Sequence, residues 1–306
     1  MLIPTSAIAN WRDLQDKVAK LFSEMGYYTE SPHHVELAGR GKKEVDVYIR
    51  DDRASVNQIM LVECKLWSHR VNQETVHAFH TVMLGSGANT GFIISRKGFQ
   101  KGAHEAAKST NIHLLTWEEL QHKFGRQWLA HQSEKLENII VELRGIDGAH
   151  LAQDTPIMTI HNNMFFNATE QWGDLFDVLA DIRIIIFAAM AQPKTYGAPG
   201  PIEVLANPDI PGAVAKSDGL YIVLLRTVRD YFEWIMPVAV GLLAKYKAVS
   251  KRGHEAFEAL PEAQFNKAFE RALDAMTEEM PIRAFRKYLG EASYASLLAE
   301  MRRRKH

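Results

Sequence analysis

The chain has 306 residues, with 36 lysines and arginines against 37 aspartates and glutamates and a formal net charge of −1. Hydrophobic residues make up 46% and charged residues 24%, which excludes collagen-like, low-complexity and fully disordered chains. Cys64 is the single cysteine, so an intramolecular disulfide is excluded and a reducing compartment is favoured. The first ten residues show no leader pattern, and no apolar run reaches the roughly 20 residues that span a bilayer. We therefore expect a soluble, cytoplasmic protein that does not contact a membrane.

The first 125 residues alternate between helical and extended patterns. Apolar residues recur at helical spacing over 11–25, and three strand-like stretches follow at 35–38, 44–49 and 59–66. Next come a helix over 71–84, a strand over 91–95, a helix over 99–109, a strand over 112–115 and a helix from Trp117. A hairpin that leads into crossover units predicts an α/β fold with a mixed sheet flanked by helices.

The rest of the chain has a different texture. We predict a helical linker over 126–160 and a mainly α-helical domain over 161–306, after an α/β domain over 1–125. Helical patterns occupy 175–190, 220–246, 262–279 and 282–301, and a stretch rich in proline and glycine runs over 192–212. The aromatic and apolar residues of 231–235 are at helical spacing and are interpreted as core.

Charged residues interrupt an otherwise apolar strand at Glu63-Cys64-Lys65. Glu63 and Lys65 are two residues apart and so project from the same face of the strand. If the strands 44–49 and 59–66 pair about a turn near Ala54, facing residue numbers sum to roughly 109, which sets Asp46 opposite Glu63 and Glu44 opposite Lys65. Two carboxylates that close repel each other unless a divalent cation lies between them. With the carbonyl of Cys64 they form an oxygen site suited to Mg²⁺.

The alternative is that Glu63 and Lys65 form a solvated pair on an edge strand and that Asp46 is a surface residue, because short motifs often match by chance. Three features favour the metal site. The charged pair follows an apolar run, the aspartate lies on the preceding strand, and a helix and a βαβ unit come next. The thiol of Cys64 points away from Glu63 and Lys65 and is interpreted as part of the core.

Several short motifs occur in a fixed order along the first third of the chain. They are Leu14-Gln15, Glu44-Val45-Asp46-Val47, Val62-Glu63-Cys64-Lys65, Gly87-Ala88-Asn89 before Gly91-Phe92-Ile93-Ile94-Ser95, and Gly98-Phe99-Gln100-Lys101-Gly102-Ala103. With these motifs the segment 11–120 resembles the PD-(D/E)XK nuclease superfamily, in particular its Mrr-like restriction-endonuclease branch. The sequence departs from the family pattern in having Val45 where a proline often precedes the aspartate.

The resemblance implies a restriction-endonuclease-like fold over 1–125 and metal-dependent hydrolysis of DNA phosphodiester bonds. It assigns Asp46 and Glu63 as metal ligands, with Cys64 contributing its carbonyl, and Lys65 as the catalytic lysine. Gln15 would be a supporting residue, and Glu44 a second one. The implied cofactor is Mg²⁺, with Mn²⁺ as a substitute.

Binding to DNA requires cationic contacts to phosphates. Two groups of basic residues flank the motif strands, and a solvated surface is the alternative for each member. The candidates are Arg40, Lys42 and Lys43 before Asp46, and Arg96, Lys97 and Lys101 after Ser95.

Three functions remain open at this stage. The first is an Mg²⁺-dependent DNA endonuclease in restriction or anti-phage defence. The second is a nucleic-acid-binding module with a degenerate nuclease site, and the third is a repair or recombination nuclease. We expect a homodimer, because a duplex has two strands to cut. The helical C-terminal domain would recognise DNA or a partner protein, and the sequence does not choose between them.

Overall fold

The computed structural model describes residues 2–151 and 172–258, apart from residues 199, 207, 211 and 218. The chain forms two compact units, which are described separately. The first comprises Met1–Leu136, Gln192–Ile202 and Leu224–Glu233, and the second comprises Glu137–Ala191, Glu203–Val223 and Trp234–His306. None of the described helices combines the length and the apolar character needed to cross a membrane.

A five-stranded mixed sheet forms the centre of the first unit, in the order β1-β4-β5-β6-β7. Strands β1, β4 and β5 pair antiparallel, whereas β5, β6 and β7 pair parallel. The predicted mixed sheet is therefore confirmed, although β1 was not predicted. The strands are β1 (Tyr28–Glu30), β4 (Val47–Asp51), β5 (Gln58–Lys65), β6 (Thr90–Ser95) and β7 (Ile112–Thr116).

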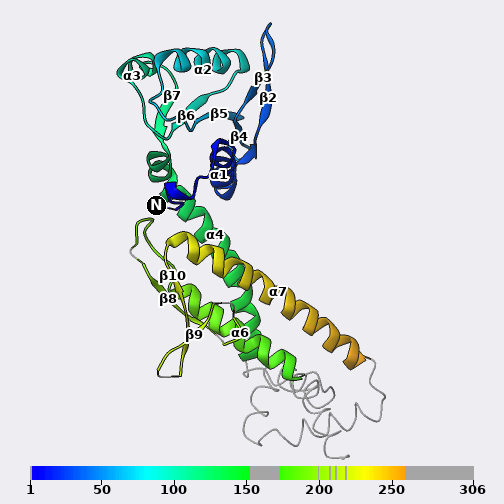
Figure 1. Cartoon of the computed structure of the whole chain (residues 1–306). Helices are drawn as coiled ribbons and strands as arrows, with labels where there is room; N and C mark the ends of the chain where they lie inside the picture. The colour runs from blue at the N-terminus through cyan, green and yellow to red at the C-terminus, as the bar shows by residue number, and fades with distance from the viewer. Residues whose placement is uncertain are drawn as a thin grey trace, which may run out of the picture. The chain divides into compact units, whose positions relative to one another are not determined.

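Helices cover both faces of this sheet (Figure 1). Helix α1 (Trp11–Glu24) contacts β4 and β5 on one face, while α2 (Gln73–Ser86) and α3 (Lys101–Ala107) contact β6 and β7 on the other. The side chain of Asn10 caps α1 by accepting a hydrogen bond from the Asp13 backbone N–H at 3.0 Å. Helix α2 connects the parallel strands β5 and β6, and α3 connects β6 and β7, as in βαβ units.

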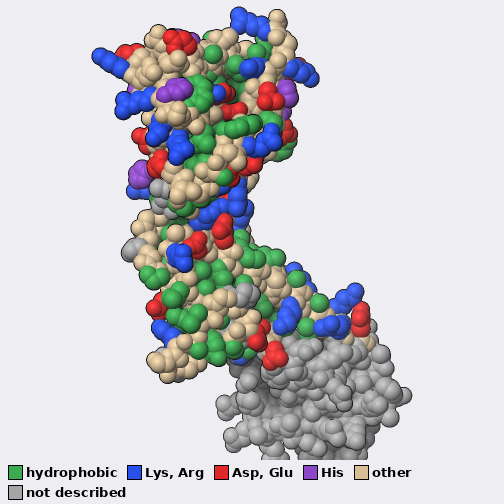
Figure 2. Space-filling view, in the orientation of Figure 1, with side chains coloured by type: hydrophobic (Ala, Val, Ile, Leu, Met, Phe, Trp, Pro, Cys, Tyr) green, Lys and Arg blue, Asp and Glu red, His purple; other side chains and the backbone are tan. Residues whose placement is uncertain are grey.

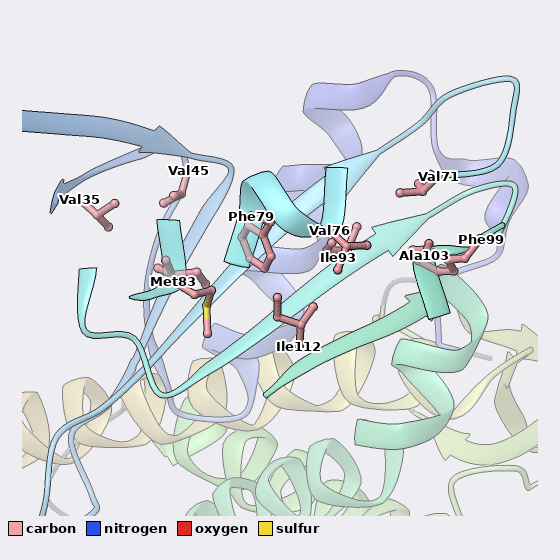
Figure 3. Packing of buried hydrophobic residues seen from close by; sticks show 11 residues of the cluster. Val35, Val45, Val71, Val76, Phe79, Met83, Ile93, Phe99, Ala103 and Ile112 are labelled. Atoms are coloured by element: carbon pink, nitrogen blue, oxygen red, sulfur yellow. The ribbon is translucent and has the colours of Figure 1, made fainter. Parts of the chain in front are cut away.

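The core beneath α2 is built from aliphatic and aromatic side chains (Figure 3). Phe79 and Met83 from the helix pack over Ile93 of β6 and the neighbouring Ile112 of β7. Gly91 permits this close packing, because a Cβ atom there would lie 2.7 Å from the ring of Phe79. The parallel strands are thus held against the helices that connect them.

A two-stranded ribbon stands beside the sheet and is made of β2 (His33–Leu37) and β3 (Gly41–Val45). The predicted strand over 44–49 is wrong in one respect, because the structure divides it at Asp46 into β3 and β4. Only β4 continues in the central sheet. The division places Asp46 at the junction between ribbon and sheet.

The first unit is discontinuous in sequence. Helix α4 (Trp117–Leu151) starts directly after β7, and the later segment Leu224–Glu233 returns to this unit. Arg229 donates hydrogen bonds to Glu24 at 2.5 and 2.9 Å, and the rings of Trp128 and Phe232 are 5.6 Å apart. The segment Leu224–Glu233, which lies far from the sheet in sequence, therefore completes the packing of the first unit.

The C-terminal part of the chain is largely helical, as predicted, with α6 (Trp172–Met190) and α7 (Val228–Glu258). It also contains a three-stranded sheet in the order β8-β10-β9, which was not predicted. The predicted helix over 220–246 is wrong at its start, because 221–225 is a strand. The predicted helices 262–279 and 282–301 lie outside the described residues. The strands are β8 (Ile202–Ala206), β9 (Val214–Ala215) and β10 (Tyr221–Leu225).

Candidate metal centre and active site

Asp46 is held in place at both its backbone and its side chain. Its carboxylate accepts a hydrogen bond from the backbone N–H of Cys64 at 2.6 Å. Its carbonyl oxygen accepts a hydrogen bond from the hydroxyl of Ser31 at 2.9 Å. The junction between β3 and β4 therefore holds this carboxylate against the end of β5.

Glu63 and Lys65 lie next to this carboxylate on β5. The predicted register is confirmed, since Val47 pairs with Val62 and their numbers sum to 109. The ladder ends at this pair, and Asp46, one residue before it, is close enough to Glu63 for the charge of Glu63 to act on its carboxyl group. Lys65 forms an ion pair with Glu63, and both side chains are largely buried. The sequence motif thus becomes a compact group of two carboxylates and one ammonium.

The electrostatics of this group are unfavourable for ionised Asp46. Burial, and then the negative charge of Glu63, raise the pKa of Asp46 from 3.8 to about 6. The Cys64 N–H, the charge of Lys65 and a hydrogen bond from Gln15 act in the opposite direction, but do not restore the ordinary pKa. A divalent cation beside the two carboxylates would stabilise their ionised forms and so oppose the effects of burial and of Glu63.

The donor set fits magnesium. Mg²⁺ binds through one or two carboxylates and retains several waters, so it does not need a cage made only of protein ligands. Among the described residues, no group of three or more His, Cys, Asp or Glu side chains is placed to hold a metal. Asp46, Glu63 and the backbone carbonyl of Cys64 would supply such an oxygen site.

Gln15 connects α1 to this site. Its side chain is buried, with 5% exposed, and it hydrogen-bonds Asp46. Glu44 does not join the group. The expected pairing of Glu44 with Lys65 is wrong, because Glu44 pairs with His34 in the ribbon, and the His34 Nε2 lies 3.7 Å from its carboxylate. The physical reason is the break at Asp46, beyond which β3 leaves the central sheet.

The thiol of Cys64 lies in the protein interior. Burial is the main reason why the pKa of this thiol is raised well above its ordinary value, and the charges of Asp46 and Glu63 act in the same direction. Such a thiol is a poor nucleophile at neutral pH. The contribution of this residue to the site is therefore its backbone.

A pocket of about 450 Å³ opens beside the carboxylate group. This volume is in the usual range for small-ligand sites. Sequence reasoning missed Asn10, Trp11, Leu66 and Trp67, which no periodic pattern singles out. The pocket is lined by Asn10, Trp11, Gln15, Asp46, Cys64, Lys65, Leu66 and Trp67.

The six basic candidates for DNA contact are exposed and lie in two places. Arg40, Lys42 and Lys43 belong to the ribbon, and Figure 2 shows lysine and arginine side chains at its free end. Arg96 and Lys97 follow β6, and Lys101 begins α3. The Arg96 N–H donates to the carbonyl of Lys65 at 3.1 Å, so this second group adjoins the end of β5.

A comparison with protein families finds a match for the first part of the chain. The family model of the Mrr catalytic domain, described as a restriction endonuclease, matches residues 7–124. None of the curated proteins compared with the chain matches it significantly.

Two solved structures are similar to somewhat more than a third of the chain. One is a protein of unknown function, AF1548, with 22% identity and a TM-score of 0.31 over 36% of this chain and 59% of that chain. The other is the MspJI restriction endonuclease in complex with a 27-mer oligonucleotide, with 18% identity and a TM-score of 0.27 over 37% of this chain and 27% of that chain. The chain thus spans less than two thirds of either protein. The family match, on a mixed sheet with the ordered motifs, identifies the N-terminal third of this chain as an Mrr-like restriction-endonuclease domain of the PD-(D/E)XK nuclease superfamily.

Proposed function

We propose that this chain is a divalent-metal-dependent endonuclease that hydrolyses phosphodiester bonds in DNA, in restriction or anti-phage defence. The observation that carries the proposal is the Asp46 carboxyl, half-buried beside Glu63, with a pKa raised to about 6. Ionising two adjacent, partly buried carboxylates is unfavourable unless another charge compensates for them. A bound divalent cation would provide that compensation.

Asp46, Glu63 and the carbonyl of Cys64 would hold Mg²⁺, for which Mn²⁺ is a substitute. When bound, this ion supplies a Lewis acid that lowers the pKa of a water and offsets negative charge on the phosphate. Gln15 orients the Asp46 carboxylate through its hydrogen bond. The Cys64 N–H donates to one oxygen of that carboxylate and so helps to fix its orientation.

Lys65 is the residue we assign to the phosphate. Glu63 holds its ammonium at the edge of the pocket, where it can donate to a non-bridging phosphate oxygen. A cation fixed there stabilises the charge that develops in the transition state, and removal of one such donor typically costs about 100-fold or more in rate.

The ribbon and the segment after β6 would contact the DNA backbone. Lys42 and Lys43 in the ribbon are exposed and would each add one phosphate contact. The Lys42→Ala/Lys43→Ala double variant should weaken binding equally for all sequences and lower the slope of log K against log salt by about 2. An unchanged slope would exclude the ribbon from the DNA contact.

The assembly and the setting belong to the same proposal. A homodimer in the cytoplasm would present two pockets to the two strands of a duplex, and the C-terminal part would select the target or a partner protein. A repair or recombination nuclease is the second candidate, because it would use the same pocket and differ only in what is recognised.

The test compares plasmid, linear duplex, single-stranded DNA and RNA with Mg²⁺ or with EDTA. Wild type should cut DNA with Mg²⁺ only, and Lys65→Ala and Asp46→Ala should lose about 100-fold or more. Lys108→Ala is the matched control, since it breaks an exposed ion pair with Glu105 on α3, away from the pocket. Cutting in EDTA, or by both site variants, would refute the assignment. A wild-type protein that binds DNA but cuts no substrate would favour a binding module with a degenerate site.

A further inference from the structure

Two tryptophan side chains are unusually exposed. The solvent-accessible fraction is 54% for Trp11 and 36% for Trp67, whereas Trp117 and Trp128 of the same unit are only 1–2% exposed. Tryptophan is normally highly buried, and a large exposed aromatic surface commonly marks a site of interaction.

Both residues line the pocket that contains Asp46 and Lys65. They come from separate elements, because Trp11 begins α1 and Trp67 follows the end of β5. An exposed aromatic pair at the candidate active site is thus produced by two distant segments of the sequence.

Each ring has a polar or cationic neighbour. The ring of Trp67 stacks on His69, with centroids 5.0 Å apart and planes 22° apart, and the Lys65 ammonium is 5.2 Å from the Trp67 centroid. The guanidinium of Arg12 is 5.2 Å from the centroid of Trp11. The indoles are therefore held by neighbours, while about half of the Trp11 surface and about a third of the Trp67 surface stay open to solvent.

We propose that Trp11 and Trp67 form an aromatic subsite that takes an unstacked nucleobase adjoining the scissile phosphate. This inference rests on the proposed function, since Lys65 is what brings a phosphate to the same pocket. Its consequence is a preference for single-stranded, forked or frayed DNA at the point of cleavage.

The chemistry of the pocket fits this ligand. Every nucleobase has a flat π-face that stacks on an aromatic side chain, whatever its sequence, and one such contact changes affinity by about 5- to 100-fold. In an intact duplex those faces are covered by neighbouring base pairs, so a base must first leave the stack to reach the indoles. A neighbouring ammonium supplies the contact to the phosphate that joins the base to the next nucleotide.

The experiment measures binding without cleavage. Labelled oligonucleotides that are single-stranded, forked or fully paired are titrated with the full-length chain in EDTA, and fluorescence anisotropy gives the Kd. Wild type should bind the single strand and the fork at least about 10-fold more tightly than the fully paired duplex of the same sequence. Quenching of the intrinsic tryptophan fluorescence should accompany binding of the single strand.

The variants Trp11→Leu and Trp67→Leu should weaken binding to the single strand by about 5- to 100-fold, and change duplex binding by less than about twofold. Trp→Phe at either position should restore part of the affinity, since it retains an aromatic face. Tyr28→Leu is the matched control, because Tyr28 is an exposed aromatic (42%) on β1 outside the pocket.

The outcomes separate this inference from the proposed function. Equal binding of single strand and duplex by wild type, with no effect of the tryptophan variants, overturns the aromatic subsite even if Mg²⁺-dependent cutting persists. Loss of self-association in the variants without a change in DNA binding would assign the surface to a second copy of the chain and also overturn it. Selective loss of single-strand binding supports the subsite even where wild type does not cut.

Discussion

Asp46→Asn should stabilise the metal-free protein while it abolishes cleavage. The carboxyl of Asp46 has its pKa raised from 3.8 to about 6, chiefly by burial and then by Glu63, so the folded chain binds its proton more tightly than the unfolded chain does. For an acid with a raised pKa, stability is lost as the pH rises from the unfolded pKa through the folded one. Asparagine keeps an oxygen for the Cys64 N–H but carries no charge at any pH.

The size of the effect follows from the shift. About 2 pKa units at 1.36 kcal/mol each give roughly 3 kcal/mol above pH 7 as an upper limit, and partial solvent screening at this half-buried site reduces it to about 1–3 kcal/mol. The difference should fall to about half at pH 5 and vanish near pH 3, where wild-type Asp46 is neutral in both states.

Thermal unfolding in EDTA at pH 8 and pH 5 measures this difference. The Asp46→Asn variant should melt roughly 2–10 °C above wild type at pH 8, and the gap should narrow at pH 5. Asp51→Asn is the control, with an effect of opposite sign. Hydrogen bonds from Arg53 lower the pKa of Asp51, so loss of the Asp51 carboxylate should lower the melting temperature at pH 8. If Asp46→Asn is less stable than wild type at pH 8, or if the gap does not depend on pH, the account of two poorly solvated carboxylates is refuted.

Other substitutions test the packing of the first unit and the state of its thiol. Arg229→Ala leaves Glu24 without its buried guanidinium and should cost about 3 kcal/mol by denaturant unfolding; a loss near zero would contradict the pairing. Gly91→Ala should cost about 1–3 kcal/mol because the added Cβ meets a buried ring, whereas Gly145→Ala, with open space around its Cβ, should add about 0.5–1 kcal/mol. Cys64 should resist iodoacetamide at pH 8 until the chain is unfolded, as seen by mass spectrometry, and Cys64→Ala should still cut DNA; rapid native alkylation would argue against a buried thiol.

Local patterns were sufficient where the chain alternates regularly. The register of β4 on β5 followed from the length of the turn and the two-residue period. Strand β1 could not be predicted, because three residues, 28–30, are too few to show a pattern. Its pairing with β4 depends on tertiary contact. The predicted helix over 220–246 wrongly includes the strand 221–225. An apolar run of that length has no periodicity that distinguishes a buried strand from a helix.

The site was predicted to the extent that it is local. Glu63 and Lys65 share a face through the strand period, and the register brings Asp46, just before β4, to the end of β5, where it accepts from the Cys64 N–H. The predicted pairing of Glu44 with Lys65 is wrong because the strand breaks at Asp46, and the residues before the break pair within the ribbon instead. No pattern in the sequence marks that break. The sequence does not single out Trp11 and Trp67, because only the packing of α1 against the sheet brings them to the same pocket.

The late segment Leu224–Glu233 has a consequence for synthesis of the protein. About 100 residues separate the end of the first block of this unit from Glu233, so at about 5–20 residues per second the ribosome needs roughly 5–20 s more before Arg229 can reach Glu24. Until then Glu24 lacks the guanidinium of Arg229, and Trp128 lacks its neighbour Phe232. A message truncated before codon 224 would therefore yield the nuclease sheet without its closing segment, a natural substrate for chaperones and proteases.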